Sequence, residues 1–351
     1  MKKRKISIFD CMAGDVLAHD IIADNGVKML VKDTVINPYI QEKLIEIGVR
    51  EVFVYEYEDG PPFFASLQKN PKQSEFHRQY GASHSDLKEI ITSLAAGNKL
   101  DVEQLSQVST FVHSKIQETE LVVQSLCTLQ NIDEHTYAHS LNTAFYAMLT
   151  GKWLKLSSGE IEKLIQSALL HDIGKVRIPA HILNKQTILT REEYEEIKKH
   201  TVFGYEMLSG TDQLDEDVKR VALLHHERID CSGYPYQAGP HFINIYARIV
   251  AVADVYDAMI TPRPYKDSLT PFAAFELFST VGMKMFDPLV LLTFLKNIVT
   301  YYVGAEVLFN TGEKGKILYI PPHDTASPVV RTKAGIIDLA REKNIRIVKM
   351  L

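Results

Sequence analysis

Residues 161–175 read IEKLIQSALLHDIGK, and this stretch decides the fold. Its apolar side chains at 161, 164, 165, 168 and 169 recur at intervals of three and four, which predicts a helix with one buried face. The helix runs directly into His171 and Asp172. The two oxygens of an Asp carboxylate can bridge a pair of cations about 3.5–4 Å apart, and the adjacent His can ligate one of them. A His-Asp pair alone is weak evidence, since a histidine that caps a helix end is the more ordinary interpretation.

Three more histidines extend the pattern on both sides of this helix. His135 and His139 lie four residues apart in DEHTYAHS, so both face one side of the helix that continues through residues 141–149. His200 ends the lysine-rich stretch EEYEEIKKH, where a solvated histidine is the ordinary expectation. Taken singly, each of these histidines favours a structural interpretation over a metal ligand.

Two further pairs of potential metal ligands lie downstream of His200. HHERIDCSGYP begins with His225, which falls on an apolar helical stripe like a core histidine, and with His226, which does not. AVADVYDAM contains Asp254 at the end of the apolar run 245–253, and Asp257 three residues later on the same face. Burying an unpaired carboxylate is very costly, so Asp254 needs a cation, a metal or several hydrogen-bond donors. Together the pairs favour a metal site over a series of separate structural explanations.

Two loops beside these pairs carry groups that suit a nucleotide. Arg263 and Lys266 follow Pro262 in TPRPYKDS, where they form either a solvated basic turn or a clamp for phosphate oxygens. Gly233-Tyr234-Pro235 follows the His225-His226 pair, and alone it indicates only a turn. A tyrosine held beside a metal centre could stack against a nucleobase or form a hydrogen bond with it.

Composition bounds the class of protein. Of 351 residues, 46% are hydrophobic and 24% charged, as in ordinary globular proteins with a buried core. The formal net charge of −5 argues against polymeric nucleic acid as a partner, but not against a small anionic nucleotide. Three scattered cysteines indicate neither a disulfide framework nor a structural zinc site. No signal peptide and no apolar run of membrane-spanning length are found, so we expect a cytoplasmic protein without a membrane partner.

Composition shifts and periodicity divide the chain into four parts. Residues 1–57 read as a small α+β module, and residues 58–85, rich in Pro, Gly, Ser, Lys and Gln, as a linker. Residues 86–300 are expected to form a helical catalytic domain, and residues 301–351 a β-rich segment. Strands are predicted at 6–9, 16–22, 27–31, 52–57, 306–309, 316–320 and 345–349.

Five stretches of the sequence resemble, in their order and spacing, the motifs of HD-GYP proteins, the branch of the HD superfamily that contains bacterial cyclic-di-GMP phosphodiesterases. These stretches are DEHTYAHS, HDIGKVRIP, KKHTVFGYEML, HHERIDCSGYP and ARIVAVADVYDAMITPRPYK. MAGDVLAHDII resembles part of the small module that often precedes such domains. The resemblance implies a mainly α protein, in which an all-helical HD-type catalytic domain follows a small α+β N-terminal module and precedes a short β C-terminal segment. It implies hydrolysis of cyclic-di-GMP to pGpG or GMP by a water that two metal ions activate.

The resemblance also implies roles for individual residues. Two transition-metal ions, iron or manganese, are expected, with ligands at His139, His171, Asp172, His200, His225, His226 and Asp254. Asp172 and Lys175 are the implied catalytic residues, and Lys175 would bind or protonate the phosphate. The implied substrate contacts are Arg263 and Lys266 on phosphate, Tyr234 near a guanine, and the carboxylates Asp133 and Asp257, which stand either behind a ligand or toward the substrate.

Two departures from the family pattern bear on activity. Some members carry a glutamate four residues before the position of His139, where it supports a third metal, but this chain has His135 there. His135 is a further candidate ligand, and we expect two metal ions rather than three. Cys231 replaces the usual glycine after HHERID, and it strains the loop if that backbone needs a positive φ.

Two other functions stay open beside cyclic-di-GMP hydrolysis. An HD phosphohydrolase acting on another nucleotide is one, although the Gly-Tyr-Pro loop disfavours it. The other is a catalytically weak cyclic-di-GMP sensor that signals to partners, which Cys231 and His135 motivate and the full ligand set disfavours. A regulatory or dimerising role of the N-terminal module, which would make the protein a homodimer, is a hypothesis from the module's position alone.

Overall fold

The computed structural model describes residues 2–11, 15, 17–22, 28–30, 36, 41, 44–45, 48–56, 71–129, 135–261 and 268–351. The chain divides into two compact units, Met1–Arg78 and Gln79–Leu351. Helices predominate in the described residues, so the predicted mainly α class is confirmed.

The first unit contains two antiparallel strand pairs. β1 (Lys2–Ser7) pairs with β4 (Glu51–Glu56), and β2 (Ile21–Ile22) pairs with β3 (Lys28–Leu30). The first strand therefore begins in the lysine-rich start, and residues 8 and 9, predicted to be in a strand, lie instead in the 3-10 turn Ile8–Asp10. Buried apolar side chains pack together as the core of this unit: Ile8, Cys11, Leu17, Ile36, Leu44, Val52 and Val54.

Helix α3 (Pro71–Ala95) corrects the predicted boundary between linker and helical domain. The linker was expected to extend to residue 85, but its last fifteen residues belong to this helix. The buried side chains of α3 recur at intervals of three and four, beginning with Phe76, Tyr80 and Ser83 and ending with Leu94. The apolar stripe is narrow and the rest of the surface polar, so composition alone concealed an amphipathic helix.

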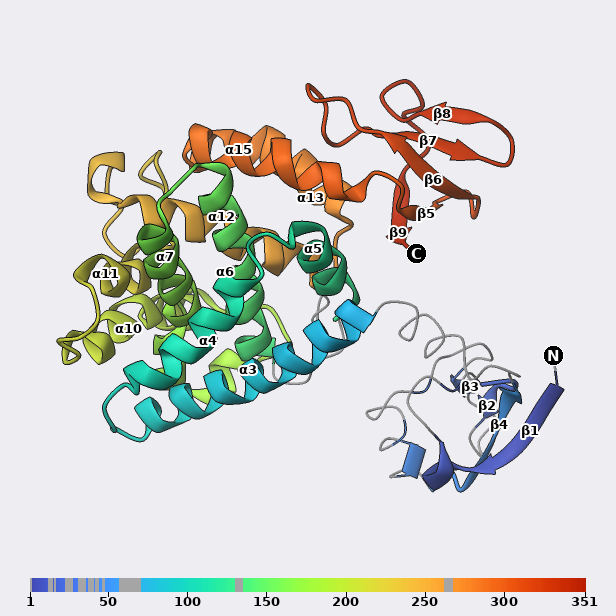
Figure 1. The fold of residues 1–351 in the computed structure, drawn as a ribbon, viewed down its shortest axis with the longest axis horizontal. Coiled ribbons are helices and arrows are strands. Elements are labelled where there is room, and N and C mark those ends of the chain that lie inside the picture. Colours follow the sequence, from blue (N-terminus) through green and yellow to red (C-terminus); the bar gives the residue numbers. More distant parts are fainter. Residues whose placement is uncertain are drawn as a thin grey trace. The chain divides into compact units, whose positions relative to one another are not determined.

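The second unit holds the helical domain (Figure 1). After α3, its helices and short turns are α4 (Val102–Ser114), α5 (Thr119–Thr128), α6 (His135–Trp153), α7 (Ser158–Leu170), η2 (Ile173–Arg177), α8 (Ala180–Leu183), α9 (Arg191–Lys198), α10 (His200–Ser209), α11 (Glu216–Leu224), η3 (Pro240–Phe242), α12 (Ile245–Ile260), α13 (Pro271–Leu277), η4 (Phe278–Gly282), α14 (Met283–Met285), α15 (Pro288–Ile298) and η5 (Val299–Tyr302).

Helices α6, α7 and α12 form the centre of this domain and contact one another (Figure 1). Helix α7 begins with a capping box, in which Ser157 and Glu160 exchange side-chain and backbone hydrogen bonds. Its predicted apolar stripe is buried, from Ile161 to Leu169. Helix α12 is buried on nearly all sides, as the continuous apolar run 245–253 predicts. The central helices are therefore the rigid elements on which the predicted ligands stand.

The C-terminal segment is a five-stranded antiparallel sheet in the order β8-β7-β6-β5-β9. β5 (Glu306–Phe309), β6 (Lys314–Tyr319) and β9 (Ile347–Met350) correspond to the predicted strands. β7 (Val329–Thr332) and β8 (Ile336–Asp338) were not predicted, because both are short and neighbour Pro, Gly and Ser. The β-rich character of this segment is confirmed.

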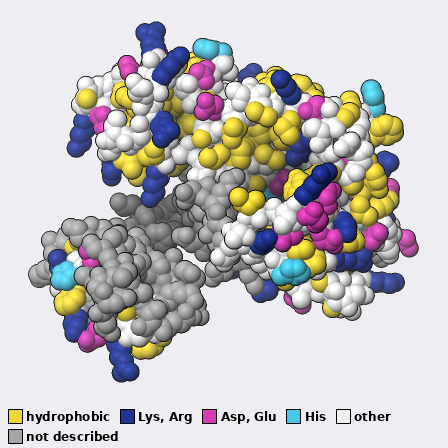
Figure 2. All heavy atoms as spheres, turned by 180° about the vertical axis from the view of Figure 1, so that it is seen from behind, with side chains coloured by type: hydrophobic (Ala, Val, Ile, Leu, Met, Phe, Trp, Pro, Cys, Tyr) yellow, Lys and Arg dark blue, Asp and Glu magenta, His cyan; other side chains and the backbone are white. Residues whose placement is uncertain are grey.

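The surface of the helical domain carries apolar as well as charged side chains. Leu277, Val281, Leu289 and Leu292, on α13, η4 and α15, are all more than 40% exposed. Figure 2 shows apolar side chains gathered over one face of the molecule, between regions with charged groups. None of the described helices is both long and apolar enough to cross a membrane.

Candidate metal centre

The predicted ligands come from five places in the chain and meet between the central helices. His139 lies on α6, His171 and Asp172 follow α7, and His200 begins α10. His225 and His226 follow α11, and Asp254 lies on α12. The ligand atoms form two groups, each within 4.8 Å: Asp172, His200, His225 and His226 in one, and His139, His171 and Asp254 in the other.

The burial of His200 bears on whether it is a solvated histidine or a candidate metal ligand. Its residue is 1% exposed, so the expectation of a solvated histidine at the end of a lysine-rich helix is wrong. The chain turns inward at this point, because α9 ends at Lys198 and a new helix begins at His200 itself.

Backbone carbonyls orient three of the imidazoles. Nδ1 of His171 lies 2.7 Å from the Ala168 oxygen, and Nδ1 of His200 lies 2.7 Å from the Ile197 oxygen. Nδ1 of His225 lies 3.0 Å from the Val221 oxygen. A carbonyl oxygen only accepts, so each Nδ1 carries the proton and donates it, which leaves Nε2 with a lone pair. This is the tautomer that binds a metal through Nε2.

Two of these lone pairs face each other. Nε2 of His200 lies 3.3 Å from Nε2 of His225. Burial lowers the pKa of His200 to about 3, and burial also lowers the pKa of His225, so neither ring gains a proton to relieve the contact at neutral pH. Two buried acceptors at this distance need a cation between or beside them.

The His-Asp pair itself leaves polar atoms for such a cation. Nε2 of His171 and Oδ1 of Asp172 are buried and have no hydrogen-bond partner within the described ranges. Burial favours the neutral form of Asp172, but the ammonium group of Lys175 is the largest influence against it, and the pKa of Asp172 lies well below the usual range. Imidazole nitrogens with carboxylate oxygens are a donor set that fits a divalent metal.

His139 is held by two carboxylates instead of a carbonyl. Its Nδ1 lies 2.7 Å from Oδ2 of Asp257, and its Nε2 lies 3.0 Å from Oδ1 of Asp254. Burial lowers the pKa of this imidazole, but the hydrogen bonds to the two carboxylates outweigh it and raise the pKa to about 9. Asp257 is 1% exposed and lies behind His139, a position that suits the alternative of a carboxylate that supports a ligand.

Glycine at position 174 brings the His-Asp pair next to His200. A Cβ at Gly174 would lie 1.9 Å from the His200 carbonyl oxygen and 2.5 Å from the Gly204 nitrogen. Only glycine permits this approach of η2 to α10. Lys175, the next residue, donates a hydrogen bond to Oδ2 of Asp172 and places a cation beside the centre.

The Gly-Tyr-Pro loop packs against the same centre. A Cβ at Gly233 would lie 2.5 Å from three backbone atoms of residues 226–228, so this turn needs glycine. The buried carboxylate of Glu227 accepts hydrogen bonds from the backbone nitrogens of Tyr236 and Ala238, at 2.7 and 2.9 Å. Cys231 has a φ of 62°, the left-handed conformation that the glycine usual at this position would adopt without strain.

Some predicted site residues lie outside the described residues. These are Asp133, Arg263, Lys266 and the side chain of His135. Sequence reasoning missed three residues that support the centre: Asn142, which bonds Asp257, Tyr80, which bonds Asn142, and Glu227. The position of Asn142, three residues after His139 on one helix, was a signal that could have found it.

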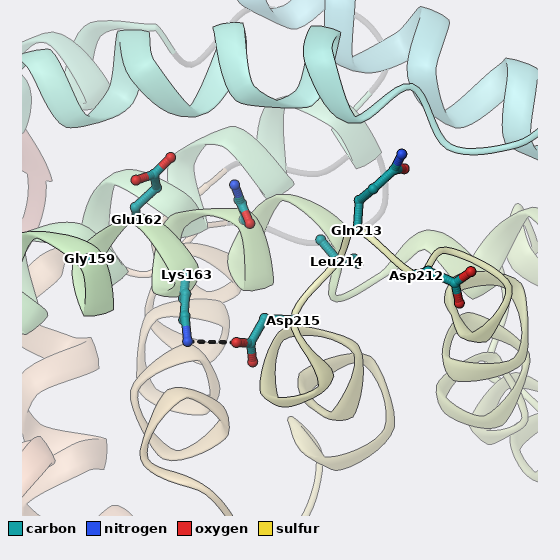
Figure 3. Close-up of a pocket in the computed structure, with 8 residues that line it drawn as sticks. Gly159, Glu162, Lys163, Asp212, Gln213, Leu214 and Asp215 are labelled. Atoms are coloured by element: carbon teal, nitrogen blue, oxygen red, sulfur yellow. Dashed lines mark ion pairs between the residues drawn. The ribbon is translucent and has the colours of Figure 1, made fainter.

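The groove in Figure 3 is separate from this centre. It has a volume of about 430 Å³ and is lined by residues of α7 and of the segment before α11, such as Glu162, Lys163 and Asp215. Lys163 and Asp215 form an ion pair of 2.6 Å across it (Figure 3). None of its lining residues belongs to the two ligand groups.

Residues 122–290 match the HD domain family. The match covers slightly less than half of the chain. The ligand-bearing elements from α6 to α12 all lie within the matched residues, so the predicted resemblance and the HD-type fold are confirmed. A solved structure described as an HDG"Y"P protein from Bdellovibrio bacteriovorus has the same fold, with a TM-score of 0.53 at 15% identity over 84% of this chain and 98% of that one.

Curated proteins similar to this chain are named for cyclic dinucleotides. A cyclic di-GMP phosphodiesterase from Pseudomonas aeruginosa is 34% identical over 63% of this chain and 53% of its own length. A cyclic di-GMP phosphodiesterase response regulator from Xanthomonas campestris is 38% identical over 49% and 46%. A 3'3'-cGAMP-specific phosphodiesterase from Vibrio cholerae is 34% identical over 48% and 33%. The chain thus spans about half the length of the first two relatives.

Proposed function

We propose that the protein is a metal-dependent phosphodiesterase that hydrolyses cyclic-di-GMP to pGpG or GMP. The observation that carries this proposal is the pair of facing Nε2 atoms of His200 and His225, 3.3 Å apart. Beside them lie buried ligand atoms of His171 and Asp172 that have no hydrogen-bond partner among the described residues. An ordinary core does not collect acceptors in this way, because each one is costly to bury. The names of the curated relatives supply the substrate class.

Two metal ions are proposed, and each group of ligand atoms would hold one of them, with Asp172 close to both groups. His171, in one group, and Asp172, in the other, are adjacent, and Nε2 of His139 lies 3.8 Å from Oδ2 of Asp172. When bound, two such ions activate a water molecule and neutralise charge on phosphoryl oxygens. Iron or manganese suits the mixed imidazole and carboxylate ligands. A third ion through His135 is not part of the proposal.

The residues around the centre have separate proposed roles. Lys175 is 23% exposed at its side chain and bonds Asp172, so it can contact a phosphate and give a proton to the leaving oxygen. Tyr234 is half-buried, with its ring against His226, and can offer its edge or hydroxyl to a guanine. Arg263, Lys266 and Asp133 are proposed as substrate contacts from the sequence alone.

The test is turnover together with metal content. The protein is purified without oxygen, analysed for metals and incubated with cyclic-di-GMP and Fe(II) or Mn(II), and the products are separated by chromatography. We expect about two metals per chain and the appearance of pGpG or GMP. 3'3'-cGAMP is assayed in parallel, because a relative is named for that substrate. Faster hydrolysis of 3'3'-cGAMP would contradict the proposed substrate but not the reaction.

Asp172→Ala separates the enzyme from the sensor hypothesis. We expect turnover to fall by more than about 100-fold, since losing even an outer partner of a metal ligand costs 10–100-fold. The control is Asp215→Ala, which removes a carboxylate from an ion pair in the separate groove and should leave turnover unchanged. Metals bound with intact cyclic-di-GMP in the wild type would favour the sensor. Light scattering tests the further hypothesis of a homodimer.

A further inference from the structure

A chain of hydrogen bonds runs from the metal centre to helix α3. Asp257, on α12, accepts from Nδ1 of His139 at 2.7 Å and from Nδ2 of Asn142 at 2.9 Å. Oδ1 of Asn142 in turn lies 2.7 Å from the hydroxyl of Tyr80. All four residues are less than 8% exposed, and Tyr80 is fully buried. The connection joins three helices that are far apart in the sequence.

The carboxylate of Asp257 fixes which groups donate and which accept in this series of hydrogen bonds. An ionised carboxylate only accepts, so Asn142 must turn its amide NH₂ toward Asp257 and its oxygen toward Tyr80. The Tyr80 hydroxyl therefore donates to Asn142, and the Ala138 carbonyl at 3.2 Å is a longer alternative. The hydroxyl thus favours the one amide orientation in which Asn142 supports Asp257.

We propose that Tyr80 is a positioning residue, which sets the His139 imidazole for metal binding through Asn142 and Asp257. The inference deepens the proposed function, since it takes His139 as a ligand of one ion. Asp257 orients the ring only if its own position is fixed, and Asn142 and the Thr261 hydroxyl, which donates at 3.0 Å, are what fix it.

The structure also says which ion is affected. His139 shares its group of ligand atoms with His171 and Asp254, whereas His200, His225 and His226 belong to the other group. The Nδ1 atoms of His200 and His225 donate to backbone carbonyls, whereas the hydrogen bonds from Tyr80 through Asn142 and Asp257 lead to His139. A change at Tyr80 should therefore weaken the binding of the ion at the His139 group and leave the binding of the other ion unchanged.

Tyr80→Phe tests this with a readout that does not depend on activity. Metal-depleted protein is titrated with Mn(II) against a competing chelator, which gives the two dissociation constants. We expect one of them to rise by about tenfold, at the lower end of the effect of outer partners, and the other to stay constant. At limiting Mn(II) turnover should fall, and at saturating Mn(II) it should return toward the wild-type kcat.

Tyr302→Phe is the matched control. Tyr302 is also a buried tyrosine, and its hydroxyl bonds the Tyr256 hydroxyl at 2.8 Å instead of Asn142. This variant should leave both dissociation constants unchanged. If Tyr302→Phe weakens the binding of an ion as Tyr80→Phe does, Tyr80 has only a general structural role and the proposal is overturned. The same holds if Tyr80→Phe weakens the binding of both ions equally.

A double-mutant cycle tests the route. If Tyr80 acts through Asn142, then Asn142→Ala weakens the same ion, and Tyr80→Phe adds nothing in that background. Additive effects would overturn the proposed route. A wild type that binds both ions but leaves cyclic-di-GMP intact would refute the proposed enzyme without touching this inference. A wild type that binds only the ion of the His200 group would refute this inference.

Discussion

The rings of Tyr234 and His226 stack, with their centroids 4.6 Å apart and their planes inclined by 30°. The tyrosine of the Gly-Tyr-Pro loop is therefore packed on a predicted metal ligand. Such a contact is worth about 0.5–1.5 kcal/mol beyond area burial. Because the loop packs on His226, a change in the loop should alter metal affinity through this residue.

Replacing the Tyr234 ring tests this connection. We expect Tyr234→Phe, which keeps the stack, to retain metal affinity, and Tyr234→Ala to weaken it by about three- to tenfold, since 1.4 kcal/mol corresponds to a factor of ten. Metal content after dialysis against a weak chelator is the measurement. Tyr236→Ala is the control, because Tyr236 lies in the same loop and is 64% exposed. Equal loss in both alanine variants would mean that the loop acts as a whole and not through the stacked ring.

Cys231→Gly should stabilise the protein. Cys231 has a φ of 62°, and a non-glycine residue in this conformation costs roughly 1 kcal/mol. Thermal unfolding should shift upward by about 2–4 °C. Cys231→Ala removes the same thiol but keeps the Cβ, so it should give no gain. If both variants gain equally, the thiol and not the backbone is responsible. An increase in turnover only with glycine would show that the strained loop also limits the reaction.

Metal removal should destabilise the protein. The buried acceptors of His171, Asp172, His200 and His225 face one another, and a cation compensates them only in the metal-bound form. A metal present at about 1,000 times its dissociation constant stabilises the folded state by about 4 kcal/mol, which corresponds to a melting temperature higher by the order of 10 °C. Calorimetry with and without a chelator measures this shift. The Asp172→Ala protein should show a much smaller one, and an equal shift would point to metal bound elsewhere.

The sequence identified the residues that meet at the candidate centre better than it identified the residues that hold them in place. His-Asp, His-His and Asp254 could be found because polar residues in apolar helical contexts require compensation. Tyr80 could not, because it lies in a stretch whose polar composition resembled a linker, and its partner Asn142 is 62 residues away. Long-range hydrogen bonds leave no periodic trace in a sequence. The same limit applies to β7 and β8, whose pairing depends on β6 rather than on their own residues.

The predicted mechanism also depends on which side chains already lack protons. The pKa of His225 is lowered, and so are those of His200 and His226, in each case mainly through burial. These three rings are neutral at pH 7 and can take a metal without losing a proton. His139 differs, because Asp254 and Asp257 raise its pKa to about 9. In metal-depleted protein it therefore carries a proton on each nitrogen at pH 7.

Metal binding beside His139 should accordingly release a proton. The ion takes the place of the proton on Nε2, so affinity at this site should rise as pH increases from 7 to about 9 and level off above the pKa. Affinity at the other site should change little over the same range. Calorimetric titration in buffers with different ionisation enthalpies measures the number of protons released at each step. Asp257→Asn removes one of the carboxylates that raise the pKa, so it should shift the rise in affinity to lower pH. A flat profile at both sites between pH 7 and 9 would contradict the assignment of His139 as the protonated ligand.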